Sequence, residues 1–198
     1  MRIAIEINGV LRNTIDKIEQ TYQKYMIDKT EGIEDEESFK YEISLPVDSL
    51  NLKNHFKFQT DEELYTFLYE DFPMEIFGHS QSTEYSTFND LNEIYLNLRD
   101  NHDILIVSDE MGKSKPSSLF FLSKFGCQIE KIKFYSNLTI NSMWNEIDVL
   151  LTSNPALLLE HPDDKTIIKY QTEYNKHIES TNSITTLKEL EFELTKIM

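Results

Sequence analysis

The sequence predicts an α/β fold in which a parallel sheet is flanked by helices and a mainly helical cap is inserted after the first strand. Three observations support this prediction. Short apolar runs of buried-strand length recur along the chain, and helix-compatible sequence separates the later runs. A much longer segment follows the first run and carries apolar residues at helical spacing. Finally, 39% of the 198 residues are hydrophobic, which is enough to fill a core.

Five apolar runs are expected as strands, at residues 3–7, 104–107, 132–135, 149–151 and 166–170. The last four are spaced for βαβ units, which build a parallel sheet. The connection between the first two runs is far longer than a crossover helix requires. We therefore expect residues 1–15 and 100–175 to form the α/β core and residues 16–99 to form a helical cap over one edge of the sheet.

Three stretches of the expected cap have helical signals. Apolar residues recur at helical spacing from Ile15 to Met26 and again from Leu91 to Leu98. Between them, Thr60 and Glu63 have the spacing of a capping box ahead of a third apolar face. The acidic run from Glu31 to Glu37 repels itself and is expected to be a solvated loop or a frayed helix end.

A further helix is expected in the C-terminal segment, residues 176–198. Thr186 and Glu189 have capping-box spacing, and one helical stripe then carries Leu187, Leu190, Leu194 and Ile197. A helix of about twelve residues is marginal alone in water, so this stripe must pack against its own core or against a partner.

Charge and cysteine content limit the classes of function. The net charge of −16 disfavours binding to nucleic acid or to anionic membranes, and it favours basic protein surfaces or metal ions. The single Cys127 excludes an intrachain disulfide, and neither a signal segment nor an apolar run of membrane-spanning length occurs. We expect a protein of the cytoplasm or of a virion interior that is not secreted.

Ligands of open parallel sheets bind beyond the carboxyl ends of the strands. The candidate site residues are therefore those that end the expected strands: Glu6 and Asn8 after the first, Ser108 after the second, and Thr152 and Ser153 after the fourth. Lys113 and Lys115 follow the second strand closely enough to reach the same edge.

Four stretches carry a resemblance to a known family: Glu6-Ile7-Asn8-Gly9-Val10-Leu11 after the first strand, Ser108 after the second, the lysine segment that follows it, and residues 148–155. Together they resemble the haloacid dehalogenase (HAD) superfamily, particularly capped members and small phage-encoded relatives. The resemblance spans most of residues 1–175. It implies a HAD-like Rossmannoid sheet and a family pattern Asp-x-Asp-Gly after the first strand, in which the first aspartate attacks phosphorus and the second is the general acid and base. Glu6 and Asn8 occupy those two positions.

The reactive groups of that pattern are changed in this chain. The additional methylene of Glu6 displaces its carboxylate by roughly an ångström, which costs about a hundredfold in rate, and the amide of Asn8 removes acid–base catalysis typically worth about 10² to 10⁴. Where the family carries metal-binding aspartates, this chain has Thr152 and Ser153, and neutral hydroxyls are poor magnesium ligands. Asp148 is expected at the other end of the same strand, roughly 10 Å away.

Two residues match the family's phosphate-binding positions. The resemblance implies that Ser108 bonds phosphate and that Lys115 is the accompanying lysine, with Lys113 and Lys124 as alternatives. The alternative interpretation makes Ser108 a turn or capping residue and Lys115 a solvated side chain.

We therefore expect a catalytically degenerate, pseudo-phosphatase HAD-fold protein that acts by protein contacts, with a protein partner or a second copy, as a structural or assembly component of a phage particle. No cofactor is expected. One alternative is a magnesium-dependent phosphatase that acts on a nucleotide or another small phosphate ester. Another is a non-catalytic phosphate or nucleotide sensor that uses Ser108 and Lys115.

Overall fold

The structure, a computed structural model, describes residues 1–30, 50–110 and 112–197. The acidic run expected as a solvated loop or a frayed helix end, residues 31–37, lies outside the described residues. Among the described helices, none combines the length and apolar character needed to cross a membrane.

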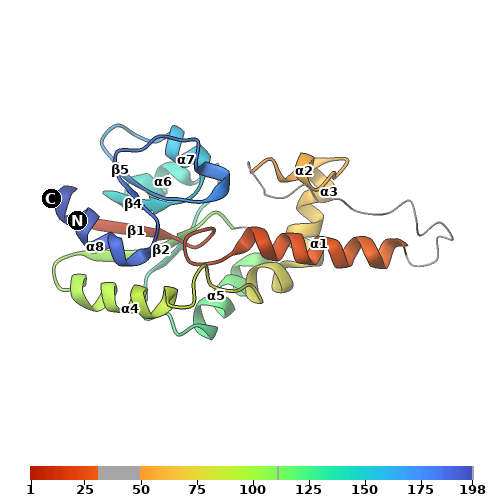
Figure 1. Cartoon of the computed structure of the whole chain (residues 1–198), viewed down its shortest axis with the longest axis horizontal. Coiled ribbons are helices and arrows are strands. Elements are labelled where there is room, and N and C mark those ends of the chain that lie inside the picture. Colours follow the sequence, from red (N-terminus) through yellow and green to blue (C-terminus); the bar gives the residue numbers. More distant parts are fainter. Residues whose placement is uncertain (31–49, 111, 198) are drawn as a thin grey trace.

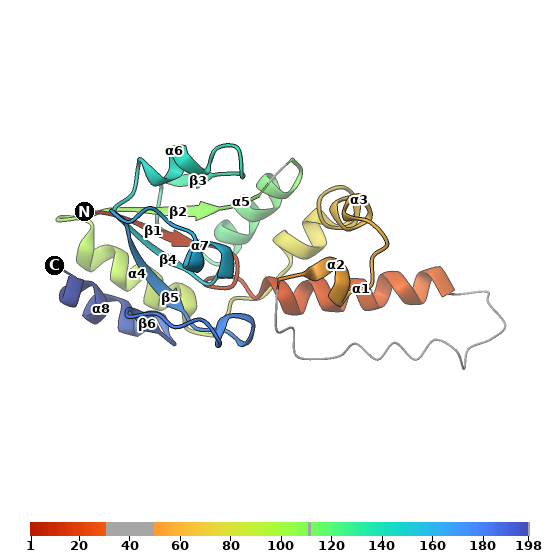
Figure 2. The ribbon, with the colours of Figure 1, turned by 90° about the horizontal axis from the view of Figure 1, so that it is seen from above.

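One parallel sheet organises the described part of the chain. Its strand order is β3-β2-β1-β4-β5-β6 (Figures 1 and 2; Figure 2 labels all six strands). The strands are β1 (Arg2–Glu6), β2 (Asp103–Ser108), β3 (Ile132–Phe134), β4 (Val149–Thr152), β5 (Thr166–Tyr170) and β6 (Ser183–Ile184). The expected α/β fold class and the five expected strands are confirmed. Because β1 lies between β2 and β4, its carboxyl end is at the centre of the sheet edge where a site was expected.

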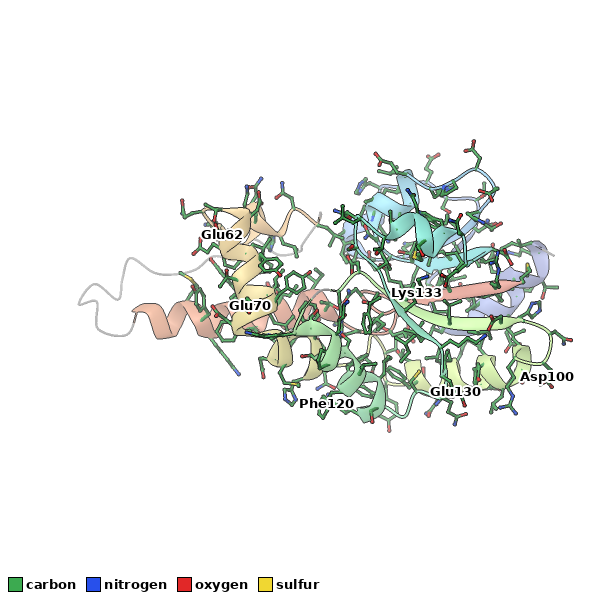
Figure 3. All side chains as sticks on the ribbon, turned by 180° about the vertical axis from the view of Figure 1, so that it is seen from behind. Glu62, Glu70, Asp100, Phe120, Glu130 and Lys133 are labelled. Atoms are coloured by element: carbon green, nitrogen blue, oxygen red, sulfur yellow. The ribbon has the colours of Figure 1, made fainter. Side chains whose placement is uncertain are left out.

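A helical extension follows β1 and projects beyond the carboxyl edge of the sheet (Figures 1 and 2). It comprises α1 (Thr14–Thr30), α2 (Leu52–His55), α3 (Asp61–Tyr65) and two π-helical segments, η2 (Thr66–Asp71) and η3 (Met74–Gly78). These elements have their own aromatic-rich core, in which Tyr22 of α1 packs against Phe56, Phe58 and Phe67. Glu62 and Glu70, labelled in Figure 3, lie on this extension.

The helix cap expected at Thr60 forms, but the Glu63 side chain binds a different backbone N–H from the one that a capping box uses. The Thr60 hydroxyl accepts a hydrogen bond from the Glu63 N–H at 3.0 Å, so α3 begins where the sequence predicts. The Glu63 carboxylate accepts from the N–H of Gln59 at 2.8 Å and not from that of Thr60.

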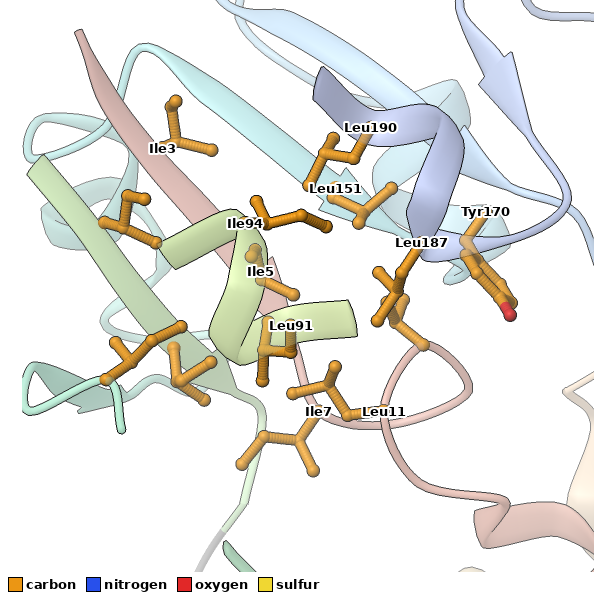
Figure 4. Packing of buried hydrophobic residues seen from close by; sticks show 14 of the residues in the cluster. Ile3, Ile5, Ile7, Leu11, Leu91, Ile94, Leu151, Tyr170, Leu187 and Leu190 are labelled. Atoms are coloured by element: carbon orange, nitrogen blue, oxygen red, sulfur yellow. The ribbon is translucent and has the colours of Figure 1, made fainter. Parts of the chain in front are cut away.

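The last helix before β2, α4 (Thr87–Leu98), packs on the sheet and not with the extension. Its buried side chains Leu91 and Ile94 join the cluster that contains Ile3 and Ile5 of β1 (Figure 4). Within the segment 16–99 expected as the cap, α1 to η3 therefore form the extension, whereas α4 packs on the sheet. Apolar periodicity shows that a helix is amphipathic but not which core it covers.

The two faces of the sheet bury different helices. Alternate residues of β1 point to opposite faces, so Ile3 and Ile5 face α4 and α5 (Ser114–Lys124), whereas Ala4 faces α6 (Ile140–Trp144) and α7 (Pro155–Leu159). This alternation places the Glu6 side chain on the same face as Ala4.

The C-terminal segment is part of the core. After η4 (Glu173–Asn175), the short strand β6 extends the sheet, and η5 (Leu187–Glu189) and α8 (Leu190–Ile197) follow. Leu187, Leu190 and Leu194 are buried in the same cluster as β1 (Figure 4). The C-terminal segment, residues 176–198, was expected to be helical, and the structure adds the short strand β6 to it, which is too short for periodicity to reveal. The apolar stripe packs against the chain's own core.

Leu190 and Phe192 offer a matched test of this packing, because Leu190 is fully buried and Phe192 is 67% exposed. Replacing Leu190 by Ala should lower the free energy of unfolding by about 2–5 kcal/mol, as for other buried leucines. Phe192→Ala should change it by less than about 0.5 kcal/mol. Urea unfolding of both variants measures the difference, and equal effects would show that α8 does not pack as described.

Candidate functional site at the carboxyl edge of the sheet

Glu6 ends the central strand and is closed in by hydroxyl groups. Its side chain is 1% exposed. The Tyr135 hydroxyl, at the end of β3, donates to Oε1 at 2.9 Å, and the Thr152 hydroxyl, at the end of β4, donates to Oε2. Both carboxyl oxygens therefore already have hydrogen-bond partners within the chain.

The environment of Glu6 also changes its protonation. Burial, and then the nearby Asp109, raise the pKa of Glu6 from its ordinary value of 4.5 to about 8, although hydrogen bonds from Thr152, Tyr135 and the Ser153 N–H act in the opposite direction. The raised pKa of Glu6 favours its neutral acid form near neutral pH more than that of an ordinary glutamate does. Because folding raises this pKa, the stability that protonated Glu6 contributes is full below about pH 4.5 and is lost as the pH rises through about 8.

The Asn8 amide uses its full hydrogen-bonding capacity. Its Nδ2 donates to Asp109 Oδ1 at 2.9 Å and to Ser108 Oγ at 3.4 Å. Its Oδ1 accepts from Arg12 Nη2 at 2.6 Å and from the Thr14 hydroxyl at 2.8 Å. A carboxylate at this position could not donate to Asp109 and would repel it. Asn8 is thus fitted to this network by the donor capacity that an aspartate lacks.

Arg12 is the centre of the network and is fully buried. Its Nε donates to Thr14, its Nη1 donates to the Phe77 carbonyl at 2.8 Å and to Ser118, and its Nη2 donates to Asn8 and Glu110. Every one of the five N–H donors of the guanidinium therefore has an acceptor. Because Phe77 belongs to η3, this side chain also ties the helical extension to the core.

Glu110 is the counter-ion of Arg12, and it is also buried. Its Oε1 accepts from the Ser108 hydroxyl at 3.0 Å, and its Oε2 accepts from the Ser118 hydroxyl. Ser108, expected as a phosphate-binding residue, thus donates its hydroxyl proton to a buried glutamate.

Ser153 and Tyr174 cover the turn after β1. The Ser153 hydroxyl lies 2.8 Å from the Tyr174 hydroxyl and donates to the Asn8 carbonyl at 3.0 Å. Gly9 in this turn has a φ of +72°, and a Cβ there would lie 2.0 Å from the Tyr174 oxygen. The glycine of the family-like turn is therefore required by both backbone conformation and space.

The three candidate phosphate-binding lysines have contacts other than with Ser108. Lys115 is exposed, and its Nζ lies 5.7 Å from the centre of the Phe134 ring. Lys113 pairs with Glu70 of η2 at 2.6 Å, and Lys124 donates to the Ser80 carbonyl at 3.0 Å (Figure 3 labels Glu70). Lys115 thus lies near Phe134, the β3 partner of Ser108, but no hydrogen bond joins Lys115 to Ser108 among the described residues.

A small cavity of about 110 Å³ lies at this edge, between core and extension. Its polar lining includes Glu6, Asn8, Asp109 and Ser153, with Tyr69 and apolar side chains of the extension around them, and none of its lining residues is a lysine or arginine. Small-molecule sites usually measure about 300–1,000 Å³, whereas a water occupies about 30 Å³. The cavity suits a few water molecules better than a phosphate ester.

The residues present do not fit a magnesium ion, which the fold family implies. Magnesium requires anionic oxygens in octahedral arrangement, whereas the oxygens of Glu6 accept hydroxyl protons and Asn8 Oδ1 lies beside the cationic Arg12. Within the described residues, no group of three or more His, Cys, Asp or Glu could hold a metal ion. Asp148 lies at the opposite end of β4, where it pairs with Arg2 at 2.6 Å.

Sequence reasoning identified Glu6, Asn8, Ser108, Thr152 and Ser153 and missed the residues that engage them. Arg12 follows an apolar turn, and Glu110 follows Ser108 by two residues. Oppositely charged residues in the turns that follow two adjacent buried strands, Arg12 after β1 and Glu110 after β2, could have indicated an ion pair across the edge. Tyr135 was included only as part of a strand, since its contact with Glu6 joins residues far apart in the sequence.

Removing the negative charge of Glu110 should leave Arg12 as an uncompensated buried cation. We expect Glu110→Gln to lower the free energy of unfolding by about 3–5 kcal/mol. The control is Asp103→Asn, which breaks an exposed pair with Lys131 and should cost less than about 1 kcal/mol. Urea unfolding compares the two variants, and a small effect of Glu110→Gln would contradict the buried ion pair.

A scan against protein-family models finds no match for this sequence, and neither does a search of curated proteins. Among solved structures, the fold is similar to a protein described as a haloacid dehalogenase-like hydrolase of Burkholderia xenovorans, with a TM-score of 0.58 over 99% of this chain and 97% of that one. The identity is 12%, so the likeness concerns the fold alone. The chain has the HAD-like α/β fold that its sequence predicts.

Proposed function

We propose that this chain is a HAD-fold protein without phosphoryl-transfer activity that acts by binding. The observation that carries the proposal is the closed network at the carboxyl edge, in which Glu6, Asn8 and Ser108 are all bonded to other residues of the chain. Phosphoryl transfer depends on positioning the phosphoryl group and neutralising its charge. Here the side chains at the positions that would position and neutralise a phosphoryl group are hydrogen-bonded to other residues of the chain.

Three further features support the same conclusion. Protonation of Glu6 removes the anion that an attacking carboxylate requires. Asp109 in the cavity lining repels a phosphate, and Arg12 is held by Glu110 within the network. The cavity itself is too small for a nucleotide.

Protein contacts are the proposed mode of action. The net charge of −16 attracts basic protein surfaces over long distances. A role in assembling a phage particle, with a protein partner or a second copy of this chain, stays part of the proposal. Affinity capture of the tagged chain from its native cells identifies such a partner, and light scattering of the pure chain measures self-association.

The purified chain should show no magnesium-dependent hydrolysis of nucleotides, sugar phosphates or an aryl phosphate. The expected turnover is far below about one per second, since neither an attacking anion nor a general acid is available. A higher turnover that Glu6→Gln abolishes would overturn the proposal.

The triple variant Glu6→Asp, Asn8→Asp, Ser153→Asp gives the converse test. It should bind magnesium in calorimetry before it gains any turnover, because the new carboxylates gather beside Asp109 and repel one another until a cation binds. Magnesium should also raise its melting temperature, which shows that the variant is folded. Magnesium binding by the native chain equal to that of the variant would contradict this account of the edge.

A further inference from the structure

Helix α5 is apolar on the side that faces solvent as well as on the side that faces the sheet. Phe121 and Leu122 are buried in the core, whereas Leu119 and Phe120 are 45% and 43% exposed. A helix that carries apolar side chains all round is normally covered all round. The outer side of α5 is therefore an apolar helix face that has no cover within the part of the chain that the structure describes.

Side chains at η3 extend this exposed face. Met74 is 43% exposed, and a Cβ on Gly78 would lie 2.4 Å from the Met74 Sδ and 3.3 Å from the Phe120 ring, so both side chains flank the same glycine. The exposed His79 packs edge-on against Phe120, with 5.5 Å between the ring centres. Leu119 and Phe120 of α5, together with Met74 and His79, form one exposed surface, which we call the α5 surface.

The charge around the α5 surface is opposite to that of the whole chain. Residues 111–129 contain three lysines and neither aspartate nor glutamate, although the net charge of the chain is −16. Lys115 lies one helical turn before Leu119, and Lys124 lies one turn after Phe120. Among the described residues, neither lysine has a carboxylate partner. The α5 surface therefore complements a partner that is acidic and carries an exposed apolar side chain.

The same chain carries such a partner surface on its extension. Residues 61–71 contain five carboxylates and no lysine or arginine, and Tyr65 among them is 39% exposed. Two of these carboxylates pair with lysines outside the segment, at 3.2 and 2.6 Å, so the segment keeps a net negative charge. Glu62 and Glu70 of this segment lie at a different place on the molecule from Phe120 (Figure 3). We call the exposed side of residues 61–71 the acidic surface.

We propose that the α5 surface of one copy of this chain binds the acidic surface of a second copy. A second copy is the partner because the chain itself supplies the complementary charge and the apolar group. Because the two surfaces differ, the contact is head-to-tail and builds a ring or an open filament, not a symmetric dimer. Repulsion between two chains of charge −16 is screened beyond about 8 Å at physiological salt, whereas charges in contact are screened less. The inference rests on the proposed function, action by protein contacts, and names the partner.

Two variants, each of which damages one of the surfaces, test the proposal by sedimentation velocity of the full chain. The native chain should form species larger than a dimer as its concentration rises. Leu119→Ser removes an apolar side chain from the α5 surface, and Glu62→Lys places a cation in the acidic surface, so each should weaken association by about tenfold or more. An equimolar mixture of the two variants should stop at a dimer, because each variant supplies the surface that the other lacks.

The matched controls carry the same substitutions at other exposed positions. Leu159→Ser on α7, where Leu159 is 68% exposed, and Glu93→Lys on α4 should associate within about twofold of the native chain. Far-UV circular dichroism shows whether each variant is folded. Should Leu119→Ser fail to fold, Lys115→Gln decides, because unchanged association of that variant would contradict the proposal.

The proposal is overturned by a native chain that stays monomeric at high micromolar concentration, by surface variants that associate as tightly as their controls, or by a mixture of the two variants that stays monomeric. A native dimer that both variants retain would be a symmetric contact elsewhere on the molecule and would also contradict it. A monomeric chain without phosphatase activity would leave the proposed function standing with a different protein as partner, so the two failures are distinguishable.

Discussion

The buried ion pair between Arg12 and Glu110 is the interaction on which the carboxyl edge depends. A buried arginine is tolerated only when its charge is matched and its donors are satisfied, and here five acceptors surround one guanidinium. Those acceptors come from the turn after β1, the start of α1, the segment after β2, α5 and η3. One side chain therefore sets the relative positions of the central strands, of the helix behind them and of the extension.

This ion pair also accounts for the residue types at positions 8 and 108. Once Arg12 lies beside position 8, the side chain there must accept from a cation and donate to Asp109, and an amide does both. Ser108 donates to Glu110, and the buried Glu6 accepts hydrogen bonds from the Tyr135 and Thr152 hydroxyls. The glycine turn is needed for the fold itself, as the close approach of Tyr174 to Gly9 shows.

Local pattern predicted much of the architecture. Short apolar runs predicted the buried strands. Apolar residues at helical spacing predicted that the long insertion after β1 is helical. Pattern could not show that α4 covers the sheet while α1 does not, since both are amphipathic. The strand ends gave the positions of Glu6, Asn8 and Ser108. Their partners Arg12, Glu110 and Tyr135 depend on contacts between distant segments, which residue type alone does not reveal.

The protonation of Glu6 is the most direct test of a closed, metal-free edge. Carbon-13 NMR measures the titration of the labelled Glu6 side-chain carboxyl carbon. The titration is followed from pH 4 to 9, with and without millimolar magnesium. The account predicts a titration midpoint near the raised pKa of about 8 that magnesium leaves unchanged. A midpoint near the ordinary value of 4.5, or one that magnesium lowers by a unit or more, would contradict it.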